Sequence, residues 1–533
     1  MRRRAYSPPR ASSQALAFGL GSSVLAIVLA GCAVGPDYSR EPAPVPTHYK
    51  EIAGWKIANP SDNIERGDWW TVYRDRALDA LLPQVEISNQ TVAADAAAYE
   101  EARAIIREAQ ANLFPTATAS YTATRTRTGA LAGTTGGSAV GVGLGTRYTT
   151  QYSAPISGTW DIDVWGRLRR QVESDTAAAQ ASAADLDNAK LSQQAMLATA
   201  YFNLRASDSL IDLLERTITQ YTKTYDIVNN QFKAGYSVTA GDVATADANI
   251  RTTQAQLASA RASRAQFEHA IAVLIGRPPA ELTVAPRNLG GGIPRIPVTV
   301  PSALLERRPD IGAAERTMQE QNALIGVNEA AYFPDISLSS MIQFIGPIPL
   351  PFSAARSIGS IAASGTQTLF NGGLTAAQVD AARAVYWQSV ANYRQTVLTA
   401  LQQVEDELAA IRFFSQQLAA ERHAVADERK AVDVFLNQFQ AGTVAFTTVV
   451  VAEVALLADE ESELTTRQNL YLASVSLIED LGGGWDTAQL PTQEQLEKGF
   501  SFLQKLPPTP PTLVESAPAD AATAPSALPP PGR

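Results

Sequence analysis

The stretch that decides the fold reads LSQQAMLATAYFNLRASDSLIDLLERTITQYTKTYDIVNNQFKAG and covers residues 191–235. It belongs to a longer interval, from Gly166 to Gly235, that contains no internal proline or glycine. Apolar side chains recur there at alternating steps of three and four, the heptad pattern of a helix that packs along one stripe. The stripe consists of Leu197, Ala200, Leu204, Ser207, Ile211, Leu214, Ile218, Tyr221, Tyr225, Val228 and Phe232. A helix over the whole interval would be roughly 100 Å long, several times the width of a small domain.

The same stripe recurs in the second half of the chain, although three glutamates interrupt it. Its members are Val404, Glu407, Ile411, Phe414, Leu418, Glu421, Val425, Glu428, Val432, Phe435 and Phe439. Four landmarks also recur in order: a Phe-Pro, a Gly after a strand-like run, a Gln-Phe-x-Ala-Gly and a Gly after an apolar helix end. They stand at Phe114-Pro115, Gly166, Gln231–Gly235 and Gly276, and again at Phe333-Pro334, Gly372, Gln438–Gly442 and Gly482. Such agreement in order and spacing predicts one unit present twice.

Each unit contains two further helices. A returning helix follows each Gln-Phe-x-Ala-Gly turn, over 238–275 and 445–481, and a shorter helix opens each unit, over 89–114 and 310–333. Each short helix ends at a Phe-Pro, because the residue before a proline is driven out of the helical region. The returning and short helices together match the long helix in length, so we expect them to stack end to end beside it.

Between the short and long helices, the residues alternate with period two, as expected for strands. Tyr152, Ala154, Ile156, Gly158 and Trp160 share one face of such a run, while Ser153, Ser157, Thr159 and Asp161 share the other. We expect one hairpin per unit, over 115–165 and 334–370, and therefore four strands in the chain.

Two interpretations of these strands remain. They could form a half-buried sheet of a water-soluble protein, which alternation alone does not exclude. They could instead each cross an outer membrane, where a tilted strand of about 9 to 11 residues suffices. Tyr152 and Trp160 would then mark the two membrane interfaces. Four strands cannot close a barrel, so the chain would have to oligomerise; three copies supply twelve strands, and the count leaves a dimer with eight open.

The composition argues against several classes of protein. The 533 residues carry a net charge of −10, which excludes nucleic-acid binding through bulk basic charge. One cysteine excludes a disulfide framework, a cysteine zinc cluster and a two-cysteine redox site. Three scattered histidines leave little for metal or proton chemistry. We therefore expect no enzyme activity, no cofactor and no metal.

The amino end indicates the compartment. Arg2, Arg3 and Arg4 precede an apolar stretch over 15–30, which is the pattern of a secretory signal. Leu29-Ala30-Gly31-Cys32 follows and resembles the lipobox of bacterial lipoproteins. That resemblance implies cleavage before Cys32 and acylation of its sulfur and its new amine, which would anchor the chain in lipid. The alternative is that Cys32 is a buried structural thiol.

These patterns predict the following organisation of the chain. We expect a signal peptide over 1–31, a lipidated extended segment over 32–75, a first repeat over 76–276, a linker over 277–309, a second repeat over 310–484 and a C-terminal segment over 485–533 with a disordered proline-rich tail. Within the repeats, we expect long helices over 167–234 and 373–441.

Several motifs together resemble the outer-membrane efflux protein family, which is TolC-like. They are the start Cys32-Ala33-Val34-Gly35-Pro36-Asp37-Tyr38, the run Leu305-Glu306-Arg307-Arg308-Pro309-Asp310-Ile311, the two Phe-Pro pairs and the two Gln-Phe-x-Ala-Gly turns. The resemblance is closest to the lipoprotein branch, the outer-membrane components of resistance-nodulation-division (RND) pumps. It implies a mainly helical fold with membrane strands: a homotrimer whose twelve-stranded β-barrel continues into a long periplasmic α-helical barrel. It also implies a periplasmic adaptor (membrane fusion protein) and an inner-membrane RND transporter as partners.

The resemblance also implies that Gly235 and Gly442 lie at the periplasmic tip, where the family docks its adaptor and gates its channel. Many relatives carry an acidic residue nine positions after the second glycine, but this chain has Val451 there, with Thr447 close by. Glu453 and Asp242 are the carboxylates that could serve a gate instead. The alternative for both is a solvated charge on a helix face.

The predicted function is therefore a passive exit duct for drugs or other small molecules, in the outer membrane of a Gram-negative bacterium. Two alternatives remain: an outer-membrane channel for type I protein secretion, and a lipid-anchored coiled-coil scaffold without a pore.

Overall fold

The computed structural model describes residues 33–52, 68–128, 147–236, 238–290, 292–294, 296, 304–349, 352–353 and 356–497. The predicted signal peptide, the predicted lipid-attachment residue Cys32 and the predicted proline-rich tail lie outside these residues.

Long helices dominate the first half of the chain. A 3₁₀ turn η1 and two short helices lead into three longer ones, and a second 3₁₀ turn, η2, follows. Their bounds are η1 Trp69–Tyr73, α2 Arg76–Leu81, α3 Pro83–Ser88, α4 Gln90–Ala111, α5 Arg167–Lys233, α6 Ala240–Leu274 and η2 Pro279–Glu281.

The second half has the same order of long helices. Its elements are α7 Leu304–Arg307, α8 Pro309–Glu329, η4 Ala330–Tyr332, α9 Leu374–Gln440, α10 Phe446–Asp480, η6 Thr487–Gln489 and α11 Gln493–Glu497. Helices α5 and α9 both have 67 residues, and α6 and α10 both have 35. The long helices expected over 167–234 and 373–441 thus begin and end within one residue of α5 and α9.

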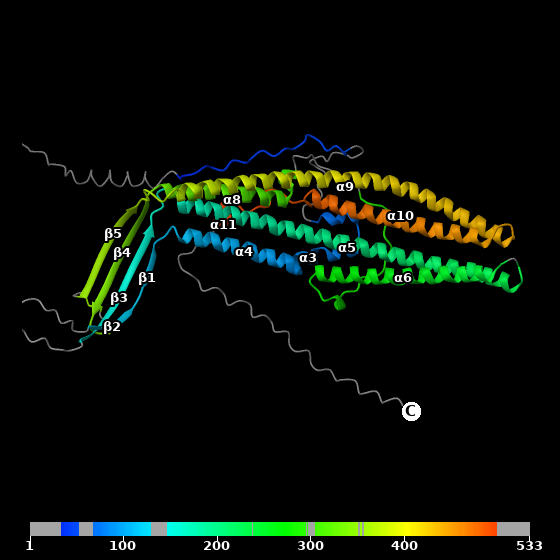
Figure 1. The fold of residues 1–533 in the computed structure, drawn as a ribbon, viewed down its shortest axis with the longest axis horizontal. Coiled ribbons are helices and arrows are strands. Elements are labelled where there is room, and N and C mark those ends of the chain that lie inside the picture. Colours follow the sequence, from blue (N-terminus) through cyan, green and yellow to red (C-terminus); the bar gives the residue numbers. More distant parts are fainter. Residues whose placement is uncertain are drawn as a thin grey trace, which may run out of the picture.

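The strands form a single antiparallel sheet at one end of the molecule (Figure 1). They are β1 Thr116–Ala119, β2 Thr122–Thr128, β3 Arg147–Asp161, β4 Asp335–Gly346 and β5 Ser357–Thr366. Both β1 and β2 pair with β3, which pairs with β4, which pairs with β5. The β3–β4 pairing joins the two halves of the chain.

The first strand, expected as one run, is divided in two. The register of β1 and β2 against β3 is continuous, and the break at Ser120 lies opposite Pro155. The Ser120 amide donates to the Pro155 carbonyl at 3.0 Å, but a proline has no N–H to donate in return. The division therefore results from a missing ladder bond and leaves the order of the sheet unchanged.

The short and returning helices meet end to end. Asn89, which caps the start of α4, donates from Nδ2 to the carbonyl of Leu274 at the end of α6, at 2.8 Å. Arg308, at the start of α8, donates from Nη1 to the carbonyl of Asp480 at the end of α10, at 3.2 Å. In each half, the two helices of this pair pack against one long helix.

Helix α5 is the centre of the helical part. It packs against α4, α6, α8 and α10, whereas α9 packs against α8 and α10. The core around it includes Trp69, Tyr201, Phe202 and Leu204, all buried. No helix in the described residues is long and apolar enough to cross a membrane.

The ends of the described chain pack against the helices. Residues 33–52 extend along α9 from the sheet toward the middle of the molecule (Figure 1, dark blue). Glu41 and Glu51 of this segment form ion pairs with Arg394 and Arg412 of α9. At the other end of the chain, Leu496 of α11 packs against α4 and α5.

Candidate functional site

The turns after α5 and α9 lie together at the end of the molecule farthest from the sheet (Figure 1). Gly235 and Gly442 have positive φ values of +77° and +76°, which residues with a side chain rarely adopt. A Cβ added at either glycine would meet no atom within 4 Å. Backbone conformation, and not crowding, therefore explains both glycines.

A small apolar cluster connects the two turns. It contains Val228 of α5, Ala246 of α6, Phe439 of α9, and Phe446 and Val449 of α10. The rings of Phe439 and Phe446 lie 5.4 Å apart. Residues from all four helices thus hold the two hairpin ends together.

Asp242 is occupied in capping α6. Its carboxylate accepts from the backbone N–H of Thr239 at 2.8 Å, while the Thr239 hydroxyl accepts from the Asp242 N–H at 3.2 Å. This reciprocal pair is a capping box and satisfies two amides of the helix start. The position of Asp242 is explained by the helix it begins.

Glu453 is not a solvated charge on a helix face. Only 7% of the residue is exposed, and its carboxylate accepts from the Thr224 hydroxyl of α5 at 2.7 Å. Tyr221 of α5 donates to the Glu453 carbonyl at 3.1 Å. Burial raises the pKa of the Glu453 carboxyl, although the Thr224 hydrogen bond opposes the rise. Glu453 thus lies in the contact between α5 and α10.

The other two gate candidates point away from the packed core of the chain. Thr447 is exposed, and Val451, one helical turn further along α10, is 69% exposed. Residues four apart share a helix face, so Thr447 and Val451 lie on one free surface near the tip.

The two aromatic residues of β3 differ in their surroundings. The Tyr152 ring stacks on Tyr121 with centroids 6.3 Å apart. The Trp160 indole N–H donates to the carbonyl of Leu113, just after α4, at 2.9 Å. Trp160 therefore lies where the sheet meets the helices.

The residues that follow Cys32 occupy a tight socket beside this junction. The Val34 amide donates to the Trp165 carbonyl at 3.0 Å. Buried Arg170 donates to the carbonyls of Val34 and Gly35, and its Nη2 lies 2.7 Å from the Asp37 carboxylate. A Cβ on Gly35 would lie 2.4 Å from the Cα of Gly326, so the segment fits only with a glycine there.

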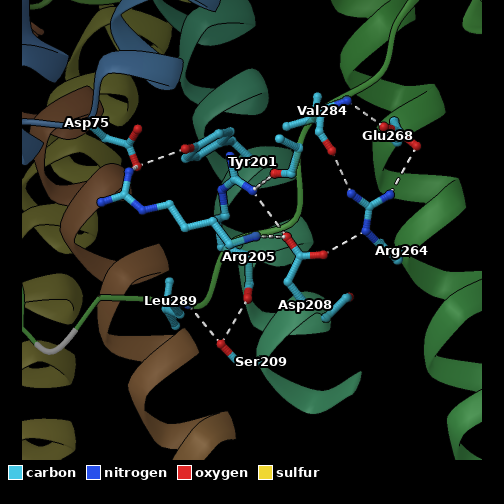
Figure 2. Close-up of polar contacts among 12 residues, drawn as sticks. Asp75, Tyr201, Arg205, Asp208, Ser209, Arg264, Glu268, Val284 and Leu289 are labelled. Carbon is cyan, nitrogen blue, oxygen red and sulfur yellow. Dashed lines mark hydrogen bonds and ion pairs between the residues drawn. The ribbon is translucent and has the colours of Figure 1, made fainter. Parts of the chain in front are cut away.

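A buried ionic network lies at mid-length and was not predicted from the sequence (Figure 2). The Asp208 carboxylate accepts from Arg205 at 3.1 Å, from Arg264 of α6 at 2.6 Å and from the Arg287 backbone N–H at 3.0 Å. Arg264 also pairs with Glu268 at 3.1 Å. The sequence feature that could have indicated this network is Arg205 followed three positions later by Asp208, inside a helix that is largely buried.

The same network holds chain segments outside α5 and α6. Arg205 donates to the Ala285 carbonyl at 2.7 Å, and the Ser209 hydroxyl accepts from the Leu289 amide at 2.8 Å. Tyr201 donates to Asp75 at 2.8 Å. The linker after α6 and the segment before α2 are thereby fastened to the central helix.

Comparison with protein families gives one match. The model described as "Outer membrane efflux protein" matches residues 81–277 and 300–483. The chain is 27% identical to the "Cation efflux system protein CusC" of Escherichia coli strain CFT073, over 86% of this chain and 97% of the relative. It is 29% identical to the "Probable efflux pump outer membrane protein TtgC" of Pseudomonas putida strain KT2440, over 90% of this chain and 98% of the relative.

Solved structures agree with these relatives. The outer-membrane channel OprN is 28% identical and matches with a TM-score of 0.76, over 85% of this chain and all of that chain. The Campylobacter jejuni CmeC outer membrane channel matches with a TM-score of 0.77 at 19% identity, over 87% of this chain and 97% of that chain. The second likeness concerns the fold alone.

Proposed function

The chain belongs to the outer membrane efflux protein family, and from that membership we propose that it is the passive exit duct of a tripartite efflux system. It is an outer-membrane efflux component. Among its relatives, TtgC is named as an efflux pump outer membrane protein and CusC as a cation efflux system protein. A water-filled duct spares a polar solute the cost of entering lipid and requires no chemistry of its own.

The proposed assembly is a homotrimer with a twelve-stranded barrel. In the part of the chain that the structure describes, β1 and β2 at one edge of the sheet pair with β3 alone, and β5 at the other edge pairs with β4 alone. Unpaired edges in lipid would be costly, because each N–H and C=O needs a partner there. Joining β5 of one copy to β1/β2 of the next satisfies both edges and closes the ring. The two halves of each chain, built on one repeated unit, would then each contribute one hairpin.

The proposed lipid anchor is Cys32, in the outer membrane of a Gram-negative bacterium. The socket formed by Arg170, Trp165 and Gly326 supports this proposal, because it holds residue 34 directly beside the end of the sheet. Acyl chains on Cys32 would therefore enter the same membrane as the strands. Tyr152 and Trp160 are proposed to lie at the two membrane interfaces.

The tip is proposed to carry the gate and to dock a periplasmic adaptor, which connects it to an inner-membrane RND transporter. The exposed turns at Gly235 and Gly442 and the free surface at Thr447 and Val451 support this placement. Glu453 would act from within the α5–α10 contact, and Asp242 through the cap of α6.

The observation that carries the proposal is the arrangement of the described residues: a sheet whose two edges have no further strand partner lies at one end, and two exposed helical turns lie at the other. The test is reconstitution of the purified full chain into planar bilayers and liposomes. We expect trimers that conduct ions and admit sugars into liposomes. A protein that inserts but passes neither ions nor sugars would overturn the channel and favour the scaffold without a pore.

The cargo is proposed to be drugs or other small molecules. Measuring the growth of an efflux-deficient strain with and without the gene, in a panel of drugs, solvents and metal salts, tests this. Secretion of a protein, with no change in growth in any of these, would contradict the proposal.

A further inference from the structure

Two joints in the molecule have the same plan. In the first, α4 meets the end of α6, and in the second, α8 meets the end of α10. Asn89 precedes Phe114 by the same interval by which Arg308 precedes Phe333. Asn89 and Arg308 each donate from the side chain to the last carbonyl of the returning helix.

A glycine closes each joint at the same place. A Cβ on Gly276 would lie 2.1 Å from the Ser88 carbonyl oxygen, and a Cβ on Gly482 would lie 1.9 Å from the Arg307 carbonyl oxygen. Both glycines also have positive φ. The backbones therefore approach equally closely in the two joints.

The chemistry of the two joints differs. The first joint is neutral: Ser88 donates to the Ile275 carbonyl at 2.6 Å, and Asn89 donates to Gln193 at 3.2 Å. The second joint encloses a cavity of about 400 Å³ with five carboxylates and one guanidinium in its lining. The charged lining residues are Arg308, Asp310, Asp406, Glu407, Glu479 and Asp480.

The five carboxylates correspond to uncharged residues of the first half. Asp310 and Asp406 correspond to Thr91 and Thr199. In the repeat, Glu407 corresponds to Ala200, and Glu479 and Asp480 correspond to Val273 and Leu274. The first joint therefore has the same backbone geometry with uncharged residues at the positions where the second joint has carboxylates.

Each element around the cavity presents its own groups. Helix α8 contributes Arg308 and Asp310, and their side chains lie 2.7 Å apart. Helix α10 contributes Glu479 and Asp480, the second of which lies 3.2 Å from Arg308. Helix α9 contributes Asp406 and Glu407.

Among the described residues, the other side chains that line the cavity carry no positive charge. Helix α5 contributes the uncharged Asn188 and Ser192, and Ser192 hydrogen-bonds to Glu479. Buried Tyr49 of the N-terminal segment interacts electrostatically with Glu405 and Arg308. One arginine therefore faces more carboxylates than it can neutralise.

We propose that the second joint is a proton-controlled clamp: proton uptake by the carboxyls around Arg308 tightens the contact between α8 and α10, and proton loss loosens it. The first joint lacks titratable groups at the matching positions and holds at any pH.

The electrostatics of the cavity supports this behaviour. Burial, followed by repulsion from neighbouring carboxylates, raises the pKa of Glu407 to about 7 and that of Glu479 to about 7. Burial raises the pKa of Asp480 to about 6, although Arg308 opposes the rise. A raised pKa in the folded protein means that the group stabilises the fold below its ordinary pKa, and that this stability is lost as pH rises through 6 to 7. The clamp is therefore tightest in mild acid.

Loosening of this joint also affects the hairpin of α9 and α10 that leads to the tip. This step rests on the proposed function. Helix α10 leads from this joint to the turn at Gly442, and α8 and α10 both pack on α9. Loosening the joint frees the sheet-side end of α10 from α8, so the hairpin of α9 and α10 can shift more easily.

The test is thermal unfolding of the purified full chain in detergent, followed by helical circular dichroism between about pH 5.5 and pH 8. We expect the wild-type Tm to fall across this range. In the double variant Glu407→Gln/Glu479→Gln, we expect the fall to be about half as large or less, with a higher Tm than wild type at the alkaline end. A purely structural role would change the Tm equally at every pH.

The matched control is Asp433→Asn/Asp459→Asn, which removes one carboxylate from α9 and one from α10 outside the cavity. The three histidines stay in all variants, so their contribution is common to every measurement. The proposal is overturned if the Tm of the Gln variant falls as much as that of wild type. If the double variant does not fold, each single variant is measured against the same criterion.

Bilayer conductance separates this inference from the proposed function. A protein that conducts no ions but shows the predicted pH difference in Tm contradicts the proposed channel function and supports the proton-controlled clamp. A protein that conducts ions, with equal Tm changes in wild type and variant, supports the channel function and overturns the clamp.

Discussion

Helices α5 and α9 have the same length and a related heptad stripe, yet the chain uses them differently. Many more side chains are buried along α5 than along α9. Helix α5 has helices of both halves around it, whereas α9 packs mainly against α8 and α10 and against the extended segment 33–52. One copy of the long helix completes its packing within the chain, and the other does not.

Helix α9 also exposes several large apolar side chains along its length. They are Leu374, Val385, Trp387, Leu398, Phe413 and Val434. In the proposed trimer, a neighbouring copy would supply the contacts that α5 finds within its own chain.

The largest expected effect comes from placing a charge on each long helix at the same position of the repeat. Leu191 of α5 is 8% exposed, and Leu398, at the matching position of α9, is 46% exposed. Leu191→Asp buries an unpaired carboxylate beside an acidic cavity, so we expect a loss of more than about 4 kcal/mol and no folded protein. Leu398→Asp should leave the chain folded and prevent trimer formation.

Light scattering of the detergent-solubilised variants, with helical circular dichroism, measures both outcomes. Ala426→Asp, on an exposed part of α9, is the control for an added charge. A Leu398→Asp protein that remains as trimeric as wild type would show that this surface of α9 is not the interface.

The two long helices also differ at the position that holds the ionic network, Asp208 in α5 and Ser415 in α9. Asp208→Asn leaves Arg205 and Arg264 without their shared carboxylate, and we expect a loss of about 3 to 5 kcal/mol. The matching position on α9 is Ser415, whose hydroxyl only bonds back to the Ile411 carbonyl. Ser415→Ala should cost less than about 1 kcal/mol. Denaturant titration of the helical signal gives both values. Equal losses would show that the Asp208 carboxylate contributes no more to stability than the Ser415 hydroxyl.

The returning helices α6 and α10 differ in how deeply one carboxylate is buried. Glu453 of α10 is buried, whereas Asp247, at the matching position of α6, is half exposed and lies 3.4 Å from Arg251. Because burial raises the pKa of Glu453, its ionisation weakens the α5–α10 contact as pH rises through that raised pKa. Glu453→Gln should therefore raise the Tm at alkaline pH and leave it unchanged below the ordinary pKa of a glutamate.

Asp247→Asn is the control, because a surface pair contributes about 0 to 1 kcal/mol at most. Melting curves at several pH values distinguish the two variants. If both changed the Tm by the same amount at every pH, burial of Glu453 would not be the cause.

The smallest effect is expected at the two tip turns. Gly235→Ala and Gly442→Ala each force a side chain into the left-handed region, at a cost of about 1 kcal/mol. Since nothing lies within 4 Å of either added Cβ, the two losses should be equal. Chemical denaturation of both variants measures them, and a clearly larger loss at one turn would reveal a contact made only in the assembly.

The sequence was a good guide wherever the signal was periodic or local. Both long helices begin and end within one residue of the expected positions, because a heptad stripe without proline or glycine permits few other conformations. The division of the first strand was missed, since it depends on which residue Pro155 faces across the sheet. The alternation of residues within a strand does not specify which distant residues it pairs with.

The candidate site was harder to predict. Asp242 and Glu453 look alike as acidic residues on helices near a turn, but one caps α6 and the other is buried against α5. The network around Asp208 was missed, because its partners come from α6 and from the linker, both far away in the sequence. Burial and partners of a charged residue depend on tertiary packing.

The sequence by itself determined the long helices, the positions of the two hairpins, the two turns and the family, because heptad spacing, alternation and glycine positions act over a few residues. Tertiary structure alone decided that α5 lies inside and α9 outside, that one joint is neutral and the other acidic, and which carboxylates are buried. The reason is that desolvation and charge pairing depend on what lies across a contact, and two copies of one unit can meet different neighbours.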